Sequence, residues 1–152
     1  MKEAKQMVVS AIQNGTVIDH VPARNLFKVI QILGLDRIDN QITFGTNLES
    51  KKLGRKAIIK ISGVFFEDED INRIALVAPD AKLNIIIDYE VVEKKVVVVP
   101  DNIVGIAKCM NPKCITNFES VTTRFRVVSK TNVSLKCHYC EKITNQENLQ
   151  II

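Results

Sequence analysis

The four cysteines of this sequence occur as two close pairs, Cys109 with Cys114 and Cys137 with Cys140. Two chain reversals that each donate two sulfurs can hold one ion in the tetrahedral geometry that zinc accepts. Four sulfur ligands leave no open coordination position, so the ion would hold the fold together and would not activate water. We therefore expect one structural Zn²⁺ bound by these cysteines.

The spacing of the cysteines leaves three other interpretations open: iron in the same cage, paired disulfides, or unrelated buried thiols. Zinc is favoured because the spacing is typical of ribbon-type sites. The sequence also begins without an apolar signal core, which predicts a cytoplasmic protein whose thiols stay reduced. His138 lies inside the second pair, and we expect it to be an exposed loop residue because four cysteines already complete the site.

The sequence offers little material for catalysis. His20 and His138 are its only histidines, and it contains no Gly-rich phosphate loop of the dinucleotide or P-loop type. Asp19 and His20 are adjacent, so on a strand their side chains would lie on opposite faces and would not orient each other. We therefore expect that the chain is not an enzyme.

The positive charge of the sequence is concentrated near its end. Residues 1–107 contain 14 Lys/Arg and 14 Asp/Glu, whereas residues 108–152 contain 7 and 3. This asymmetry indicates a polyanion or an acidic protein surface as partner, and a zinc-ribbon nucleic-acid-binding module is the alternative function to consider. Nucleic acid is the less favoured partner, because aromatic platforms are few and no basic recognition helix is evident. The densest apolar run, residues 96–99, is far too short to cross a bilayer, so we expect no membrane partner.

The hydrophobic pattern predicts strand, helix, two strands, helix and strand before residue 90. The expected strands are 16–21, 41–48, 56–62 and 82–87, with a hairpin loop at 49–55, and the helices are 24–33 and one that begins in the acidic cluster 67–70 and ends at Pro79. Residues 91–99 would add a further strand, and residues 124–128 and 133–136 alternate like strands of a small β unit.

The predicted fold class is α+β: a ferredoxin-like antiparallel sheet with two helices on one face, followed by a small zinc-bound all-β domain. The sequence at 100–102 (PDN) is the best domain boundary, so we expect domains at 1–100 and 101–152. A piece of about 50 residues buries little apolar surface, so the second domain should depend on its metal.

The combination of motifs resembles the family of aspartate carbamoyltransferase regulatory chains. The resemblance runs nearly end to end and rests on residues 15–23 (GTVIDHVPA), GRK at 54–56 leading to Lys60 and Ile61, Asn84, YEVV at 89–92, and the four cysteines ending in CHYCEK at 137–142.

The resemblance implies a non-catalytic regulatory subunit of aspartate carbamoyltransferase in pyrimidine biosynthesis. Its first domain would bind the competing allosteric effectors CTP and ATP, with UTP as a further candidate, and its zinc domain would dock on a catalytic chain. A second regulatory chain would complete a homodimer. The effector site that the resemblance implies contains Ile12, Val17, Asp19, His20, Lys56, Ile58, Lys60, Asn84, Ile86, Tyr89, Val91 and Lys94.

Overall fold

The computed structural model describes residues 11–152, which divide into two compact units, one ending at Val98 and one spanning Val99–Ile152. The first ten residues of the predicted domain 1–100 lie outside the described range.

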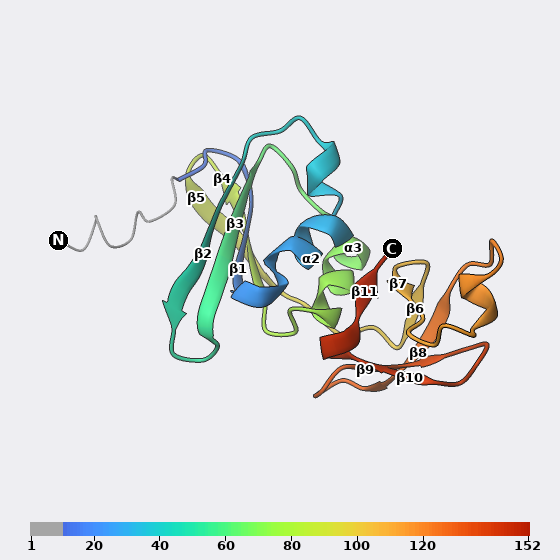
Figure 1. Cartoon of the computed structure of the whole chain (residues 1–152). Helices are drawn as coiled ribbons and strands as arrows, with labels where there is room; N and C mark the ends of the chain where they lie inside the picture. Colours follow the sequence, from blue (N-terminus) through green and yellow to red (C-terminus); the bar gives the residue numbers. More distant parts are fainter. Residues whose placement is uncertain (1–10) are drawn as a thin grey trace. The chain divides into compact units, whose positions relative to one another are not determined.

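The N-terminal unit is built on one antiparallel sheet of five strands in the order β2-β3-β1-β4-β5 (Figure 1). The strands are β1 (Gly15–Pro22), β2 (Ile42–Ser50), β3 (Gly54–Ser62), β4 (Lys82–Ile87) and β5 (Glu90–Val96). The first four strands have the neighbour relations of the ferredoxin-like motif, and β5 extends the sheet beyond β4. The predicted fold class of this unit is confirmed.

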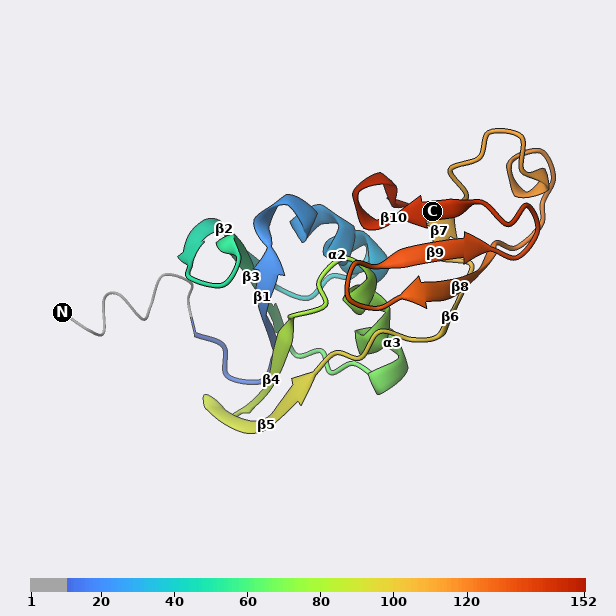
Figure 2. The same cartoon turned by 90° about the horizontal axis from the view of Figure 1, so that it is seen from below.

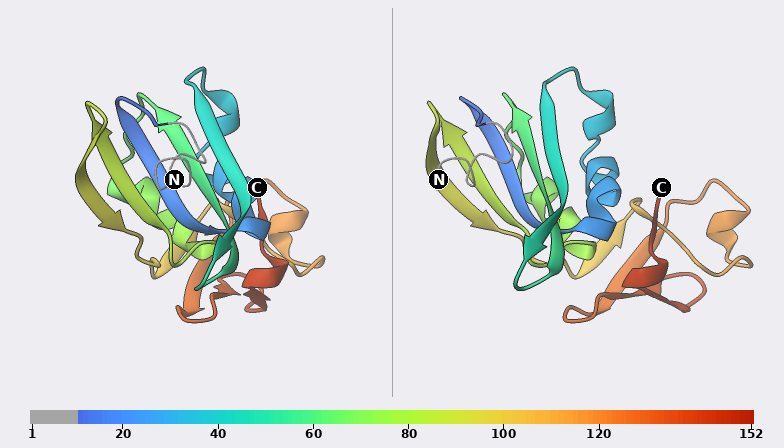
Figure 3. Two further views of the ribbon diagram at one scale, coloured as in Figure 1. Left: turned by 90° about the vertical axis from the view of Figure 1, so that its left-hand side faces the viewer. Right: turned by 60° about the vertical axis from the view of Figure 1, so that its left-hand side comes forward.

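Two helices, α2 (Leu26–Ile32) and α3 (Asp68–Arg73), lie on one face of this sheet, as Figure 3 shows with the sheet in front. The core forms between them and the fully buried strand residues Ile18, Ile59 and Leu83, which are neighbours across three strands. Burial of the apolar side chains between the helices and the sheet is the main favourable contribution to folding of the unit. The opposite face of the sheet is not covered by these helices.

Both helices are shorter than the sequence predicts. 3₁₀ turns replace the first turn of the predicted helix 24–33 (Ala23–Asn25) and the end of the second (Ile74–Leu76), and a further 3₁₀ turn follows α2 at Leu35–Arg37. The buried Asn25 side chain donates a hydrogen bond of 2.8 Å to the carbonyl of Val77, which joins the two helical segments. That bond is a tertiary contact that helical periodicity does not reveal.

The C-terminal unit contains a four-stranded antiparallel sheet in the order β10-β9-β8-β6 (Figure 2). It also contains a two-stranded ribbon, β11-β7. Its strands are β6 (Asn102–Val104), β7 (Ala107–Lys108), β8 (Arg124–Ser129), β9 (Ser134–Cys137), β10 (Ile143–Asn145) and β11 (Gln150–Ile151), with 3₁₀ turns at Ile115–Asn117 and Gln146–Asn148. Its core is thin, with Ile103, Phe125, Leu135 and Leu149 buried. The all-β character expected of this unit is confirmed.

In the described part of the chain, no helix has both the length and the apolar character needed to span a bilayer.

Candidate functional site

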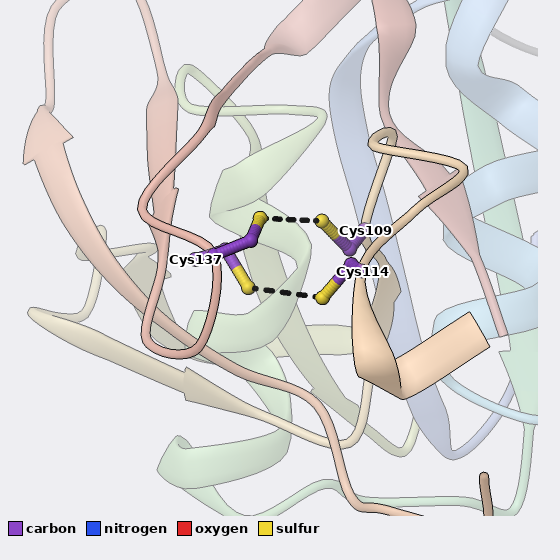
Figure 4. Close-up of side chains that lie close together, drawn as sticks. Cys109, Cys114 and Cys137 are labelled. Atoms are coloured by element: carbon purple, nitrogen blue, oxygen red, sulfur yellow. Dashed lines mark hydrogen bonds between the residues drawn. The ribbon is translucent and has the colours of Figure 1, made fainter. Parts of the chain in front are cut away.

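The four cysteine sulfurs meet at one point of the C-terminal unit. Cys109 follows β7 and Cys114 precedes the 3₁₀ turn at Ile115–Asn117, while Cys137 ends β9 and Cys140 lies three residues further on. All four Sγ atoms lie within 4.8 Å of one another, and all but that of Cys140 belong to buried residues. Figure 4 shows the cysteines of the first pair facing Cys137 across a small gap.

The distances between these sulfurs fit a tetrahedral ion. The Sγ atoms of Cys109 and Cys140 are 3.6 Å apart, and those of Cys114 and Cys137 are 3.7 Å apart. A Zn–S bond of about 2.3 Å separates the sulfurs of a tetrahedral site by about 3.8 Å. None of the four forms a disulfide.

Backbone hydrogen bonds shape both cysteine loops for metal binding. The amide of Cys114 donates to the carbonyl of Asn111 at 3.0 Å, and the amide of Glu141 donates to the carbonyl of Cys137 at 3.0 Å. Glu141 has a positive φ of 65°, which reverses the chain directly after Cys140. Each tight loop therefore directs two sulfurs to the same side.

Neighbouring side chains fix the first loop further. The Asn117 amide nitrogen donates to the carbonyls of Cys109 and Asn111 at 3.1 and 2.8 Å, and the Thr116 hydroxyl lies 3.2 Å from the Cys114 sulfur. Such outer contacts hold ligands in the orientation that a metal requires. The sequence analysis did not identify Asn117, because nothing in its spacing marks it as a support for the loop.

Without a cation, negative charge on the buried sulfurs of Cys109 and Cys137 is unfavourable. Desolvation by burial raises the pKa of the Cys109 and Cys137 thiols. Desolvation also acts to raise the pKa of Cys140, but hydrogen bonds from the Asn111 side chain and the Lys142 backbone lower it to about 7. A divalent ion would bring all four to the thiolate form, and the closed donor set would give it a structural role. His138 is exposed and lies outside the cluster, as expected.

The second group of predicted site residues lies on the face of the five-stranded sheet that the helices leave uncovered. The register pairs Lys60 with Val17, Val17 with Asn84 and Asn84 with Lys94, so these four residues form one row across β3, β1, β4 and β5. The row has a cation at each end, a buried valine and an amide between them. Partial burial lowers the pKa of Lys60, because desolvation penalises its charge.

Three further predicted residues, Asp19, Lys56 and Ile58, lie further along strands β1 and β3 of the same sheet. The Lys56 ammonium is 3.0 Å from a carboxylate oxygen of Asp19, and Ile58 is two residues from both Lys56 and Lys60 on β3. Lys82 pairs with Asp19 across β1 and β4 and was not predicted as a site residue. Only the strand register reveals that Lys82 lies beside Asp19, and the sequence alone does not provide that register.

The expectation that Asp19 and His20 lie on opposite faces is wrong. His20 has a positive φ of 61°, and the register of β1 against β3 shifts between Ile18 and Val21. This bulge interrupts the alternation and brings the His20 Nδ1 atom to 3.6 Å from an Asp19 carboxylate oxygen. That nitrogen is buried and has no hydrogen-bond partner among residues 11–152.

The remaining predicted residues gather at the end of the sheet where β4 turns into β5. Ile86 pairs with Gly15 on one side and with Val91 on the other. The two-residue turn contains Asp88 and Tyr89, both with positive φ, and the amide of Tyr89 donates to the carbonyl of Gln13 at 2.9 Å. Ile12 is next to Gln13, and its side chain lies beside Gly15. The strand register thus places Val17, Lys60, Asn84, Ile86, Val91 and Lys94 on one face of the sheet, with Ile12 and Tyr89 beside the adjoining turn.

Both units match known protein families. Residues 7–98 match the family model described as the allosteric domain of the aspartate carbamoyltransferase regulatory chain, and residues 101–150 match the model of its metal-binding domain. A regulatory chain from Bacteroides fragilis is 58% identical over the full length of both chains. A regulatory chain from Pyrococcus horikoshii is 53% identical, covering 95% of this chain and 96% of that one. With the metal-binding domain match, the four clustered cysteines form a site for a single structural zinc.

Proposed function

Because this chain belongs to the family of aspartate carbamoyltransferase regulatory chains, we propose that it binds nucleotides and thereby changes the activity of a catalytic chain. It is the regulatory and not the catalytic chain of the enzyme. Its task would be feedback control of pyrimidine biosynthesis in the cytoplasm, with CTP as inhibitor and ATP as activator.

The observation that carries the nucleotide proposal is the row of Lys60, Val17, Asn84 and Lys94. Its apolar centre offers a surface for a base or sugar, and the Asn84 amide can donate and accept hydrogen bonds at a base edge. The lysines are suited to the phosphates of a nucleoside triphosphate, and Lys56, four residues from Lys60 on β3, is paired with Asp19. CTP, ATP and UTP would share this face, so each would displace the others.

We assign the docking role to the C-terminal unit, because its zinc site fixes the two loops that close a thin core. The N-terminal unit would carry the effector and the C-terminal unit would carry the contact with the catalytic chain. Coupling between such sites is typically about 1–3 kcal/mol and requires that the effector contacts two states of the complex differently.

A second copy of the chain is proposed to pair along β2. This edge strand contains no charged residue before Glu49, whereas the opposite edge strand, β5, has charges at Glu90, Glu93, Lys94 and Lys95. Edge charges oppose strand pairing and uncharged edges permit it. Phe44 on β2 and Phe27 on α2 form an exposed edge-to-face pair with centroids 6.1 Å apart, which adds apolar area near this edge. Sedimentation should detect a dimer that Phe44→Glu weakens and Phe65→Glu, in an exposed loop, does not.

The test of the main proposal is the aspartate saturation of the catalytic chain from the same organism, measured alone and with this chain. CTP and ATP should shift the aspartate concentration for half-maximal rate only when this chain is present. Absence of any nucleotide effect in a complex that has formed would refute the regulatory proposal. Tight, salt-dependent binding of RNA or DNA without nucleotide binding would favour the nucleic-acid alternative instead.

A further inference from the structure

The hairpin turn between β4 and β5 contains two residues in a strained backbone conformation. Asp88 and Tyr89 have φ values of 49° and 67°, and the flanking residues Ile87 and Glu90 are cross-strand partners. A two-residue turn of this kind needs a positive φ at both central positions, which is why it usually contains Asn-Gly. Tyrosine disfavours a positive φ, so this turn needs contacts from outside the hairpin to keep its shape.

The segment that precedes β1 supplies those contacts. The side-chain oxygen of Asn14 accepts a hydrogen bond of 3.1 Å from the amide of Asp88, and the carbonyl of Gln13 accepts one of 2.9 Å from the amide of Tyr89. Each of the two turn residues is therefore held by one residue of this segment. We call Gln13 and Asn14 the clip.

The clip is itself attached to a third part of the N-terminal unit. The carbonyl of Asn14 accepts a hydrogen bond of 2.8 Å from the amide of Gly63, which follows β3. Gly15 comes directly after the clip and is paired with Ser62 on β3 and with Ile86 on β4. Because the backbone of Asn14 is anchored in this way, its side chain reaches the turn from a fixed position. Replacement of that side chain removes one contact with the turn and leaves the backbone contacts of the clip in place.

The turn adjoins the part of the proposed effector face that has no cation. Ile86 lies two residues beyond Asn84 on β4 and pairs with Val91, so the surface between the row of lysines and the turn is apolar. The charged residues at this end of the hairpin, Asp88 and Glu90, are both acidic and would repel phosphates. When the lysines hold the phosphates of a nucleotide, its base therefore belongs beside the turn.

We propose that Asn14 is a positioning residue of the effector site, which acts by holding the Asp88–Tyr89 turn in the conformation that accepts the base. This inference rests on the proposed binding of nucleotides. Without the Asn14 side chain the turn would relax from its strained conformation, and binding would then include the cost of restoring it. That cost falls on the nucleoside part of the ligand and does not depend on the number of phosphates.

The test compares cytidine with CTP as ligands of the full-length, zinc-loaded chain. Asn14→Ala should raise the Kd of both ligands by the same factor, about fivefold or more, because the site is no longer preorganised. Lys94→Ala should raise the Kd of CTP and leave that of cytidine within about twofold, since its contact is with a phosphate. A residue with only a structural role would not separate the two ligands from Lys94→Ala in this way.

Asn40→Ala provides the matched control. The Asn40 side chain also forms a hydrogen bond with the backbone of this unit, donating to the carbonyl of Ser62 at 3.0 Å, but it does not contact the turn. Both Kd values should stay within about twofold of those of the unmutated chain.

A double variant shows whether Asn14 acts through the turn. Glycine adopts a positive φ without a supporting contact, so Asp88→Gly added to Asn14→Ala should return both Kd values to within about threefold of the unmutated chain. Unchanged Kd values for Asn14→Ala, a rise confined to CTP, or no recovery in the double variant would each overturn the inference and leave the proposed function intact. An unmutated chain that binds neither CTP nor cytidine would refute the proposed function itself.

Discussion

Lys94 and Lys95 are neighbours on β5 that belong to opposite faces of the sheet. Lys94 pairs with Asn84 in the row proposed for the effector, whereas Lys95 lies 2.9 Å from Asp68 at the start of α3. The two residues have the same charge and the same length, so they form a matched pair for separating effector contact from general electrostatics.

Lys94→Ala should weaken CTP and ATP binding about tenfold or more, because a hydrogen bond to a charged group contributes about 1.5–3 kcal/mol. Lys95→Ala should leave both affinities within about twofold, since its cation interacts with Asp68 and Glu93. Calorimetric titration of each variant with each nucleotide measures the difference. Equal weakening by the two substitutions would argue against the proposed face.

The cysteine thiols determine how zinc binding depends on pH. Burial raises the pKa of Cys109 and Cys137, so at pH 7 both are protonated without metal and must lose their protons when zinc binds. Lowering the pH therefore weakens binding. With at least two protons released, the apparent affinity should fall about hundredfold between pH 7 and pH 6. Competition with a chromophoric chelator at the two pH values measures this, and a fall of less than about fivefold would be inconsistent with buried thiols.

At the scale of the elements, the start of β1 allows no side chain. Gly15 has a φ of 143°, and a Cβ there would overlap the carbonyl oxygen of Ile61 on the adjacent strand. Gly15 is also the cross-strand partner of Ile86, so this close approach of strands supports the proposed effector face.

Gly15→Ala should lower the free energy of unfolding of the N-terminal unit by about 2–3 kcal/mol, since the clash is with backbone and cannot be relieved by a rotamer change. Gly34→Ala is the control, because Gly34 also has a positive φ but a Cβ there meets nothing within 4 Å. It should cost only about 1 kcal/mol. Urea denaturation followed by circular dichroism compares the two, and equal losses would contradict the steric explanation.

The sequence predicted the elements of the N-terminal unit well where a single face is buried. β3 was expected at 56–62 and is Gly54–Ser62, and β4 was expected at 82–87 and has those bounds. Prediction was poorer where backbone conformation depends on tertiary contacts. The turn at Asp88 and Tyr89 has two residues with positive φ without the usual Asn-Gly sequence, and the bulge at His20 has no local signal.

The two sites differed in how far sequence could define them. The cysteine spacing favoured these four residues as zinc ligands, because two close pairs of soft sulfur ligands are typical of a ribbon-type site. The row on the sheet came only from resemblance to a family, because a lysine that alternates with apolar residues usually marks a solvated face. The register that joins Lys60 to Lys94 across four strands is a property of the folded chain.

At the scale of the whole molecule, we propose that the N-terminal unit binds the effector and that the C-terminal unit docks on the catalytic chain. The N-terminal unit has a core of its own and does not depend on the metal for its sheet. The C-terminal unit has a thin core, and structural zinc stabilises comparable folds by about 10–16 kcal/mol. Removal of zinc should therefore unfold one unit and spare the other.

The most direct test of this central claim is sedimentation of the catalytic chain from the same organism with this chain, with zinc bound and after chelation. The zinc-loaded chain should sediment as a complex with the catalytic chain. The metal-free chain should sediment apart from it and should still bind CTP in a parallel titration. A metal-free chain that joins the catalytic chain as tightly as the zinc-loaded one would contradict the account.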